Sequence, residues 1–512
     1  MYPGAYARTT PNKPAVIMAE TGETVTFGEL ETRSIRLAHH FAAIGLRRGD
    51  HVALLTDNNP KVFEIYWAAM RSGLYLTAVN RHLTADEVAY IVDDCGAAAL
   101  LVSATLGDLA VAVAERTPGL THRLAFGGEV AGHVDLDTVT AQYPDTPPAD
   151  QPRGADMLYS SGTTGRPKGI KPDLPNRQID EPGDTMTEMN ARVWGVTSDT
   201  VYLSPAPLYH AAPLRTCASV QALGGTVVVM GRFDAEKALE YIERYRVTYA
   251  QWVPTMFVRM LKLPAETRAK YDVSSLQVAV HAAAPCPVDV KRAMIEWWGP
   301  VLSEYYSSTE LNGMTMVDTP EWLDHPGTVG RAVLGVVHIC DDDGNEVPSG
   351  TVGSVYFERD VLPFHYHNDP EKTASAQHPA HPTWTTTGDV GYLDEGGYLF
   401  LTDRATFMII SGGVNIYPQE IENCLALHPA VIDCAVIGIP DPEMGESVLA
   451  VIHAAPDATP GPELAEEITD FLRGTLARYK VPRRVEFSAD LPRTPTGKLV
   501  KRTLKDRYSI AV

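Results

Sequence analysis

The residues best suited to chemistry lie in the segment YSSGTTGRPKG, at positions 159–169. Its glycines let the backbone curl so that N–H groups face an anion, and its hydroxyls and the Lys168 ammonium add further donors. Such a loop suits phosphate. It is not a Walker A motif, because Pro167 precedes Lys168 and Gly169 follows it. The residues expected to contact phosphate are Ser160, Ser161, Gly162, Thr163, Thr164, Gly165 and Lys168.

This segment resembles the phosphate-loop signature of the adenylate-forming superfamily, which includes acyl-CoA synthetases, peptide-synthetase adenylation domains and firefly-type luciferases. Other segments resemble the remaining motifs of that superfamily, in the same order and across nearly the whole chain. They are PLYH (207–210), HAAAP (281–285), YYSSTE (305–310), TTGD (386–389), SGGVNIYP (411–418) and PRTPTGK (492–498). The resemblance implies an enzyme that activates a carboxylic acid with ATP and then passes the acyl group to coenzyme A.

The resemblance also assigns residues to the nucleotide. Asp389 would accept hydrogen bonds from the ribose hydroxyls, since a carboxylate can take two O–H donors at once. Glu310 and Thr164 would bind Mg²⁺. Ser307 stands where the superfamily more often has glycine, and alanines stand where glycines are commoner in the turn along the adenine. The nucleotide residues outside the phosphate loop are Ala283, Ala284, Pro285, Tyr305, Tyr306, Ser307, Thr309, Asp389 and Arg404.

The catalytic residues that the resemblance implies are Lys498, Lys168, His210 and Glu310. Lys498 would bridge the carboxylate and ATP during adenylation. Two anions meet in that step, so positive charge is needed where negative charge develops in the transition state. An ammonium on a flexible stem supplies it. His210 would gate the acyl pocket, and no covalent enzyme intermediate is required.

For the second half-reaction, Gly412 and Gly413 would line the pantetheine tunnel, because adjacent glycines let a thiol chain pass close to the backbone. Thr406 occupies the hinge position, where relatives carry a charged residue, and Val414 replaces the usual glutamate. The segment RYKVP (478–482) resembles a motif near the CoA nucleotide, although a solvated basic cluster explains it equally well.

The elements that must position these groups follow an α/β pattern. Apolar residues at helical spacing predict a helix over 27–45, with a capping box at its start and Gly45 at its end. Short β-branched runs predict strands buried on both faces of a mostly parallel sheet. These runs lie at 51–55, 98–103, 224–230, 247–253 and 276–282.

A chain of 512 residues exceeds the usual single-domain size. The predicted fold class is α/β, with a large N-terminal domain of mostly parallel sheets and helices and a small mobile α+β C-terminal domain. We expect an adenylation domain over 1–402, which holds the ATP and acyl pockets, a hinge over 403–406 and the mobile domain over 407–512.

Composition limits the partners. The net charge of −21, from 43 Lys and Arg against 64 Asp and Glu, argues against general nucleic-acid binding. Six scattered cysteines indicate neither a disulfide framework nor a zinc site. Without a signal peptide or a long apolar run, a cytoplasmic protein with no transmembrane segment is expected. The expected partners are a carboxylic acid, ATP and CoA, and a homodimer is left open.

Three alternatives use the same sequence differently. The fold could load an acid onto a carrier protein, could serve a luciferase-like oxygenase, or could be a non-catalytic ATP sensor. Ala211 follows His210 where amino-acid-activating relatives place an aspartate, and the set Lys168, Glu310, Asp389 and Lys498 argues against a sensor. Small residues at 211–213 and 282–284 predict a medium- or long-chain fatty acid or a bulky aryl or steroid-type acid.

Overall fold

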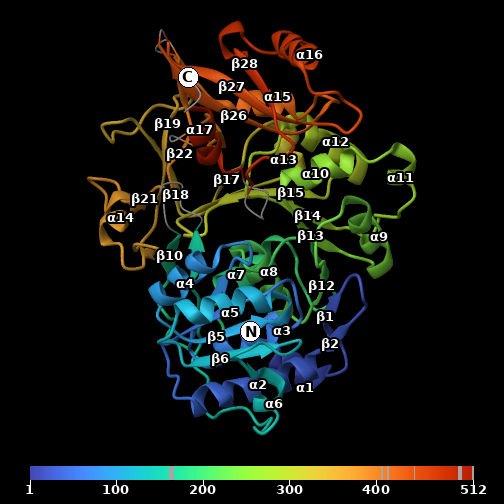
Figure 1. Ribbon diagram of the computed structural model, residues 1–512, viewed down its shortest axis with the longest axis vertical. Coiled ribbons are helices and arrows are strands. Elements are labelled where there is room, and N and C mark those ends of the chain that lie inside the picture. The colour runs from blue at the N-terminus through green and yellow to red at the C-terminus, as the bar shows by residue number, and fades with distance from the viewer. Residues whose placement is uncertain (161–166, 405–406, 412–413, 443, 494–498, 510–512) are drawn as a thin grey trace. The chain divides into compact units, whose positions relative to one another are not determined.

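The computed structural model describes residues 1–160, 167–404, 407–411, 414–442, 444–493 and 499–509 (Figure 1). Contacts within the chain divide it into two compact units. Unit 1 consists of Met1–Gln251, Ala265–Ala279 and Pro363–Ala374, and unit 2 of Trp252–Pro264, Val280–Leu362 and Ser375–Val512.

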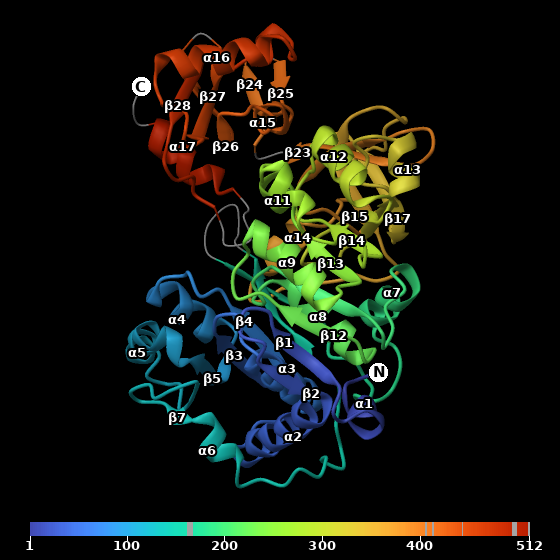
Figure 2. The same cartoon turned by 90° about the vertical axis from the view of Figure 1, so that its right-hand side faces the viewer.

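One sheet of unit 1 is entirely parallel. Its strand order is β7 (Val134–Asp135), β6 (His122–Phe126), β5 (Ala97–Ser103), β3 (His51–Leu55), β4 (Tyr75–Val79) and β8 (Ala155–Asp156). Figure 2 shows α4 (Ala85–Asp94) and α5 (Gly107–Arg116) on one face, and α2 (Phe27–Ala43) and α3 (Lys61–Arg71) on the other. Every residue of β3 and β4 is buried, as expected for strands covered on both faces.

A second group of unit 1 strands runs in the order β13 (Tyr249–Trp252), β11 (Val201–Ser204), β12 (Thr226–Val229), β1 (Pro14–Met18) and β2 (Thr24–Thr26). It is parallel except for β2. Three short strands pair antiparallel in the order β20 (His365–Tyr366), β10 (Lys168–Lys171) and β9 (Leu158–Ser160). Other elements here are α1 (Gly4–Thr9), η1 (Ala104–Leu106), α6 (Leu136–Thr140), α7 (Thr185–Val193), α8 (Ala211–Ala222), α9 (Ala235–Tyr245), α11 (Ala265–Ala269) and α14 (Pro370–Ser375).

Unit 2 is dominated by antiparallel pairing. Strand β14 (Val278–His281) contains the boundary between the units. The strands β15 (Leu302–Ser307), β16 (Met314–Asp318) and β17 (Arg331–Leu334) form a meander. A further sheet runs β18 (Val336–Cys340), β19 (Gly353–Glu358), β22 (Asp389–Leu393) and β23 (Leu399–Arg404), with β21 (Trp384–Thr385) on β19. The helices are α10 (Pro254–Leu261), α12 (Val288–Trp298) and α13 (Thr319–Asp324).

The C-terminal part of unit 2 has its own sheet, in the order β25 (Val414–Ile416), β24 (Ile409–Ser411), β27 (Gly445–Ala454) and β26 (Val431–Asp441), with β28 (Arg484–Phe487) parallel to β27. Helices α15 (Pro418–Leu425) and α16 (Pro462–Arg473) pack on one apolar cluster of this sheet, and α17 (Lys501–Ser509) packs on a second. The short helix η2 (Arg478–Lys480) precedes β28. The expected α/β class, with large N-terminal and smaller C-terminal parts, is confirmed.

The predicted local elements are also found. Helix α2 begins with the capping box, in which the Thr26 amide donates to Glu29 Oε2 at 2.8 Å and the Glu29 amide donates to Thr26 Oγ1 at 3.2 Å. The helix ends at Ala43, two residues before the predicted end, and Gly45 turns the chain with φ +95°. The five predicted strands correspond to β3, β5, β12, β13 and β14.

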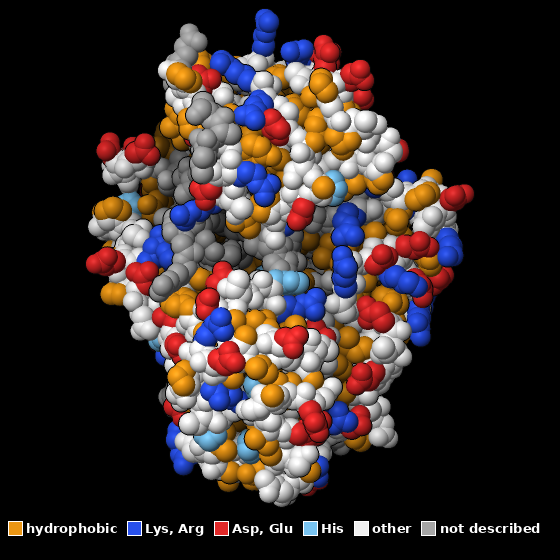
Figure 3. All heavy atoms as spheres, viewed as in Figure 1, with side chains coloured by type: hydrophobic (Ala, Val, Ile, Leu, Met, Phe, Trp, Pro, Cys, Tyr) orange, Lys and Arg blue, Asp and Glu red, His pale blue; other side chains and the backbone are white. Residues whose placement is uncertain are grey.

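Surface charge agrees with the mixed composition. Figure 3 shows acidic and basic side chains interspersed among the described residues on the visible face. The six cysteines are free thiols. Within the described residues, no helix is both long enough and apolar enough to span a membrane.

Candidate active site

The ends of the phosphate loop are held opposite each other in unit 1. Strands β9 and β10 pair antiparallel, with Lys168 opposite Ser160 and Gly169 opposite Tyr159. The five loop residues Ser161, Gly162, Thr163, Thr164 and Gly165 lie outside the described residues. The strand pairing therefore fixes where this loop begins and ends.

Gly169 is required by close packing. A Cβ atom there would lie 2.5 Å from Met157 Cε and 3.0 Å from Tyr159 Cζ. The Tyr159 hydroxyl donates a hydrogen bond of 2.5 Å to Asp94 Oδ2. Burial, and next this hydrogen bond, raise the pKa of Tyr159 far above its usual range. The tyrosine therefore stays a neutral donor that ties the strand before the loop to helix α4.

Lys168 follows the loop on β10. Its Nζ lies 5.7 Å from the ring centroid of Tyr366 on β20, within reach of a cation–π attraction. Ile170 pairs with Tyr366 in the adjacent register. These contacts position the Lys168 ammonium beside the three-stranded sheet.

His210 directly precedes α8, where its ring lies 4.4 Å from that of Tyr209. Its buried Nε2 has no hydrogen-bond partner among the described residues. Burial lowers the pKa of His210 to about 3, so the ring is neutral at pH 7. A neutral imidazole carries no net charge that would oppose an apolar chain beside it.

Two segments that were expected to bind the nucleotide meet in unit 2 at Asp389. The Tyr306 hydroxyl donates to Asp389 Oδ2 at 2.7 Å, and the Thr387 hydroxyl donates to the same atom at 2.9 Å. Asp389 is 8% exposed. On the paired strands β22 and β23, Asp389 lies opposite Arg404 in register. The structure thus brings the segments YYSSTE, TTGD and the start of the predicted hinge together, although the Arg404 side chain lies outside the described residues.

Ser307 fits its place without the freedom of glycine. Its hydroxyl donates a 2.7 Å hydrogen bond to the Gly313 carbonyl, which closes the turn that follows β15. Its φ is not among the positive values of the chain. Tyr305 and Ser307 lie on β15, and Thr309 and Glu310 lie in the half-buried turn beyond it.

One carboxylate at this turn is compatible with Mg²⁺, which commonly uses one or two carboxylates together with substrate phosphates. That carboxylate belongs to Glu310. The other expected ligand, Thr164, lies outside the described residues. Among the described residues, no group of three or more His, Cys, Asp and Glu could hold a metal ion without substrate oxygens.

The turn expected along the adenine is strained. It follows β14, and Ala283 has φ +74°, the left-handed region that disfavours residues with a Cβ. Ala283, Ala284 and Pro285 are all exposed. The alanine therefore occupies a position where glycine would be free of strain.

We expect Ala283→Gly to raise the free energy of unfolding by roughly 0.5–1 kcal/mol, because relief of strain outweighs the added freedom of the unfolded chain. Urea unfolding followed by circular dichroism checks this. Ala284→Gly is the matched control: it is equally exposed but has no positive φ. It should lose stability by up to about 1 kcal/mol. Equal effects of the two substitutions would contradict the prediction.

The residues on either side of the terminal loop, which contains Lys498, contact each other. The Arg493 Nε donates to the Asp433 carboxylate at 2.5 Å. Arg493 also forms an antiparallel bridge with Leu499, and the Val500 amide donates to the Pro492 carbonyl at 2.7 Å. Lys498, one residue before this bridge, lies outside the described residues. One end of its loop is thus anchored to β26 through Asp433, and the other end pairs with the first.

The residues on either side of the two glycines expected along the pantetheine path also pair with each other. Ser411 on β24 pairs with Val414 on β25. Gly412 and Gly413, like Thr406 of the predicted hinge, lie outside the described residues. The hairpin places the ends of the glycine segment beside each other.

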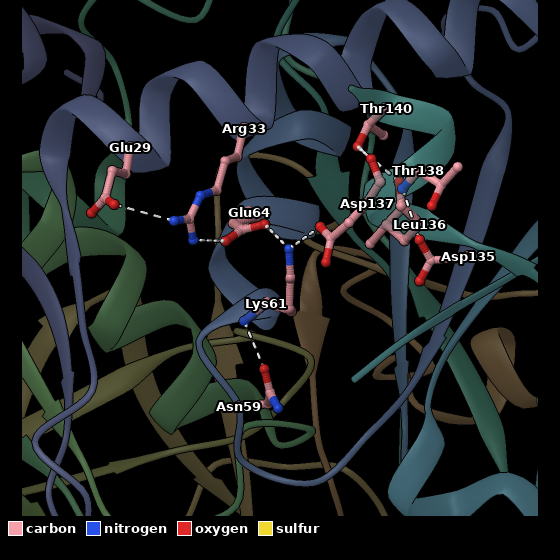
Figure 4. A network of polar contacts seen from close by, with 10 residues as sticks. All are labelled: Glu29, Arg33, Asn59, Lys61, Glu64, Asp135, Leu136, Asp137, Thr138 and Thr140. Carbon is pink, nitrogen blue, oxygen red and sulfur yellow. Dashed lines mark hydrogen bonds and ion pairs between the residues drawn. The ribbon is translucent and has the colours of Figure 1, made fainter. Parts of the chain in front are cut away.

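A cavity of about 410 Å³ elsewhere in unit 1 is a poorer candidate. Figure 4 shows the network of polar contacts formed by some of the residues that line it. The carboxylate of buried Glu64 accepts from Arg33 at 2.9 Å and from Lys61 at 3.0 Å, and Lys61 also contacts Asp137. Although burial opposes it, these acids raise the pKa of Lys61. Because Arg33 and Lys61 are already paired with carboxylates, they are less available to bind a triphosphate.

The motifs agree with comparisons to known proteins. Residues 5–362 match the family described as AMP-binding enzyme, and residues 420–498 match the AMP-binding enzyme C-terminal domain. The chain is 34% identical over 516 residues to the fatty acid–[acyl-carrier-protein] ligase ScoC of Streptomyces coeruleorubidus, covering 98% of this chain and 95% of that protein. It is 33% identical over 514 residues to a feruloyl-CoA synthase of an Amycolatopsis species, covering 99% and 98%.

Among solved structures, the chain is similar to the o-succinylbenzoate CoA synthetase MenE of Bacillus subtilis in complex with the acyl-adenylate intermediate OSB-AMP. The TM-score is 0.81 at 26% identity, covering 98% of this chain and 97% of that one. The extent and identity of these matches show that the chain belongs to the AMP-binding enzymes, as an acid–thiol ligase of the acyl-CoA synthetase family in the adenylate-forming superfamily.

Proposed function

We propose that this protein is an acid–CoA ligase, which converts a carboxylic acid and ATP to acyl-AMP and pyrophosphate and then converts acyl-AMP and CoA to acyl-CoA and AMP. The observation that carries the proposal is the Tyr306–Asp389–Thr387 hydrogen-bonded set, because it joins two separate nucleotide motifs at one buried carboxylate. Such a carboxylate is suited to accept hydrogen bonds from a ribose.

In the first half-reaction, a carboxylate oxygen attacks the α-phosphorus and pyrophosphate leaves. Lys168 and the phosphate loop bind the phosphates, Asp389 orients the ribose, and Lys498 neutralises charge where the two anions meet. Glu310 and Thr164 would hold Mg²⁺, which supplies further positive charge to the phosphates when bound. His210, which is neutral, borders the acyl chain.

In the second half-reaction, the CoA thiolate attacks the acyl carbon and AMP leaves. We propose that residues 407–512 rotate about the hinge 403–406, so that Lys498 is withdrawn and Gly412 and Gly413 border the pantetheine. The division into 1–402, 403–406 and 407–512 belongs to this proposal.

A carrier protein is the second candidate acceptor, and the 34% identity to an acyl-carrier-protein ligase favours it. The deciding experiment begins with carboxylate-dependent ATP–pyrophosphate exchange across a panel of acids. AMP release is then measured with CoA and, separately, with a carrier protein bearing phosphopantetheine. CoA-dependent release supports the proposal, whereas release with the carrier alone assigns the other acceptor. Oxygen uptake after adenylation would instead indicate an oxygenase.

We propose a medium- or long-chain fatty acid or a bulky aryl or steroid-type acid as substrate. Each methylene that fits should improve kcat/KM about fourfold, from roughly 0.8 kcal/mol of burial, until the pocket is full. Ala211, the first residue of α8, follows the gate residue and is only partly exposed. A larger side chain at this position should therefore reduce the space beside the gate residue.

We expect Ala211→Trp to shift the best substrate toward shorter acids, because the indole would fill space otherwise open to the chain. The measurement is kcat/KM across a homologous series of acids. Ala131→Trp, at an exposed position between β6 and β7, is the control and should leave the optimum unchanged. An acetate optimum in the wild type, or an unmoved optimum in Ala211→Trp, would contradict the prediction.

A further inference from the structure

Unit 2 contains a buried ion pair whose residues lie next to the expected nucleotide segments in the chain. Lys291 Nζ on α12 is 2.6 Å from Glu304 Oε2 on β15. The Lys291 side chain is completely buried and that of Glu304 is 6% exposed. The Lys291 ammonium also lies 4.7 Å from the ring centroid of Trp322, which is buried on α13. Removing two charges from water costs free energy, and their mutual attraction offsets this cost only if the geometry of the pair is well defined.

A buried histidine faces the same carboxylate. His281 Nε2 is 3.5 Å from Glu304 Oε2, and neither ring nitrogen has a hydrogen-bond partner among the described residues. The ring packs edge-on against Phe257, with 5.4 Å between the centroids. Burial, and next the charge of Lys291, keep the pKa of His281 well below its usual range. The imidazole is therefore neutral.

All three residues of this cluster lie next to the segments expected to bind the nucleotide. His281 is the last residue of β14 and immediately precedes the turn 282–285. Lys291 lies in the first turn of α12, just after that segment, and Glu304 immediately precedes Tyr305 and Tyr306. The Glu304 carboxylate, on the strand that carries the two tyrosines, thus contacts His281 before the turn and Lys291 after it.

We propose that Glu304, held by Lys291 and facing His281, is a positioning residue that sets the turn 282–285 against Tyr305 and Tyr306 for nucleotide binding. The inference rests on the proposed function, since it takes these two segments as the adenine site. The turn needs such support because Ala283 holds it in a strained conformation. Glu304 itself points into the interior, toward Lys291, and its role is exerted through the backbone of both segments.

The test separates positioning from mere stability. Glu304→Gln keeps the length of the side chain but removes the charge that matches Lys291. The double variant Lys291→Met/Glu304→Met replaces both charges by apolar groups of similar volume, which commonly restores stability. We expect Glu304→Gln to unfold at lower temperature, and the double variant to unfold near the wild-type temperature. In both variants the ATP concentration needed for half-saturation should rise about tenfold, because the Glu304 carboxylate that connects the two segments is absent in each.

Two readouts are measured on the full chain. The first is the MgATP concentration that half-saturates the rise in unfolding temperature. The second is KM for ATP and for the acid in ATP–pyrophosphate exchange, where KM for the acid should stay within about twofold. Glu31→Gln is the matched control, because Glu31 pairs with the fully buried Arg71 in unit 1. It should lower the unfolding temperature without changing the ATP requirement.

The outcomes distinguish this inference from the proposed function. A wild-type protein that is stabilised by ATP but shows no carboxylate-dependent exchange would refute the function, and the ATP titrations of the variants would still decide the positioning role. A folded double variant with wild-type ATP affinity would overturn the inference. So would a wild-type protein that ATP does not stabilise, and so would an equal loss of ATP affinity in Glu31→Gln.

Discussion

Replacing Lys498 by alanine is expected to abolish acyl-AMP formation while largely sparing thioester formation from synthetic acyl-AMP. In the proposed mechanism the ammonium is needed only while carboxylate and triphosphate meet, so its loss should slow the first half-reaction by about 10²-fold or more, or roughly 2.7 kcal/mol or more. The two half-reactions are measured separately, by ATP–pyrophosphate exchange and by AMP release from supplied acyl-AMP with CoA.

Lys501→Met provides a control nearby in sequence. Its ammonium pairs with Glu422 at 2.9 Å and is buried, so this lysine has a structural partner within unit 2. Its loss should lower the unfolding temperature without separating the two half-reactions. Equal damage to both half-reactions in Lys498→Ala would count against a lysine that serves adenylation alone.

Replacing Asp389 by alanine is expected to lower kcat/KM for ATP by about 10²-fold. The substitution removes the proposed acceptor of the ribose hydroxyls and leaves the Tyr306 and Thr387 hydroxyls without their acceptor. Hydrogen bonds to a charged group contribute roughly 1.5–3 kcal/mol, which corresponds to about 10- to 10²-fold. Steady-state kinetics with ATP varied at saturating acid measure the effect.

Tyr306→Phe tests the same hydrogen-bonded group by removing a donor to Asp389 instead of Asp389 itself. It removes only the hydroxyl that orients Asp389, so kcat/KM for ATP should fall by no more than about tenfold. The order of the two effects is the critical result. If Asp389→Ala kept wild-type kinetics for ATP, or if Tyr306→Phe were the more damaged variant, Asp389 would not be the ribose acceptor.

Much of the architecture could be predicted from local patterns. Thr26 and Glu29 specify a helix start because both partners of a capping box lie within one turn, and the structure has both hydrogen bonds. Apolar runs such as 51–55 specify buried parallel strands because a strand covered on both faces has no polar side. The assignment of site residues from the motifs stays a prediction, because several of them lie outside the described residues.

The sequence by itself determined the family and the fold class, because glycine-rich loops, capping boxes and apolar runs act over short spans whose residues are adjacent in the chain. It could not single out Lys291 and Glu304, since a lysine and a glutamate outside any motif are usually solvated charges. Only the tertiary structure placed them 2.6 Å apart in the interior, joined Tyr306 to Asp389 across 83 positions, and gave Ala283 its strained φ. Such contacts depend on how distant segments pack, because burial and hydrogen-bond geometry are set by the whole fold.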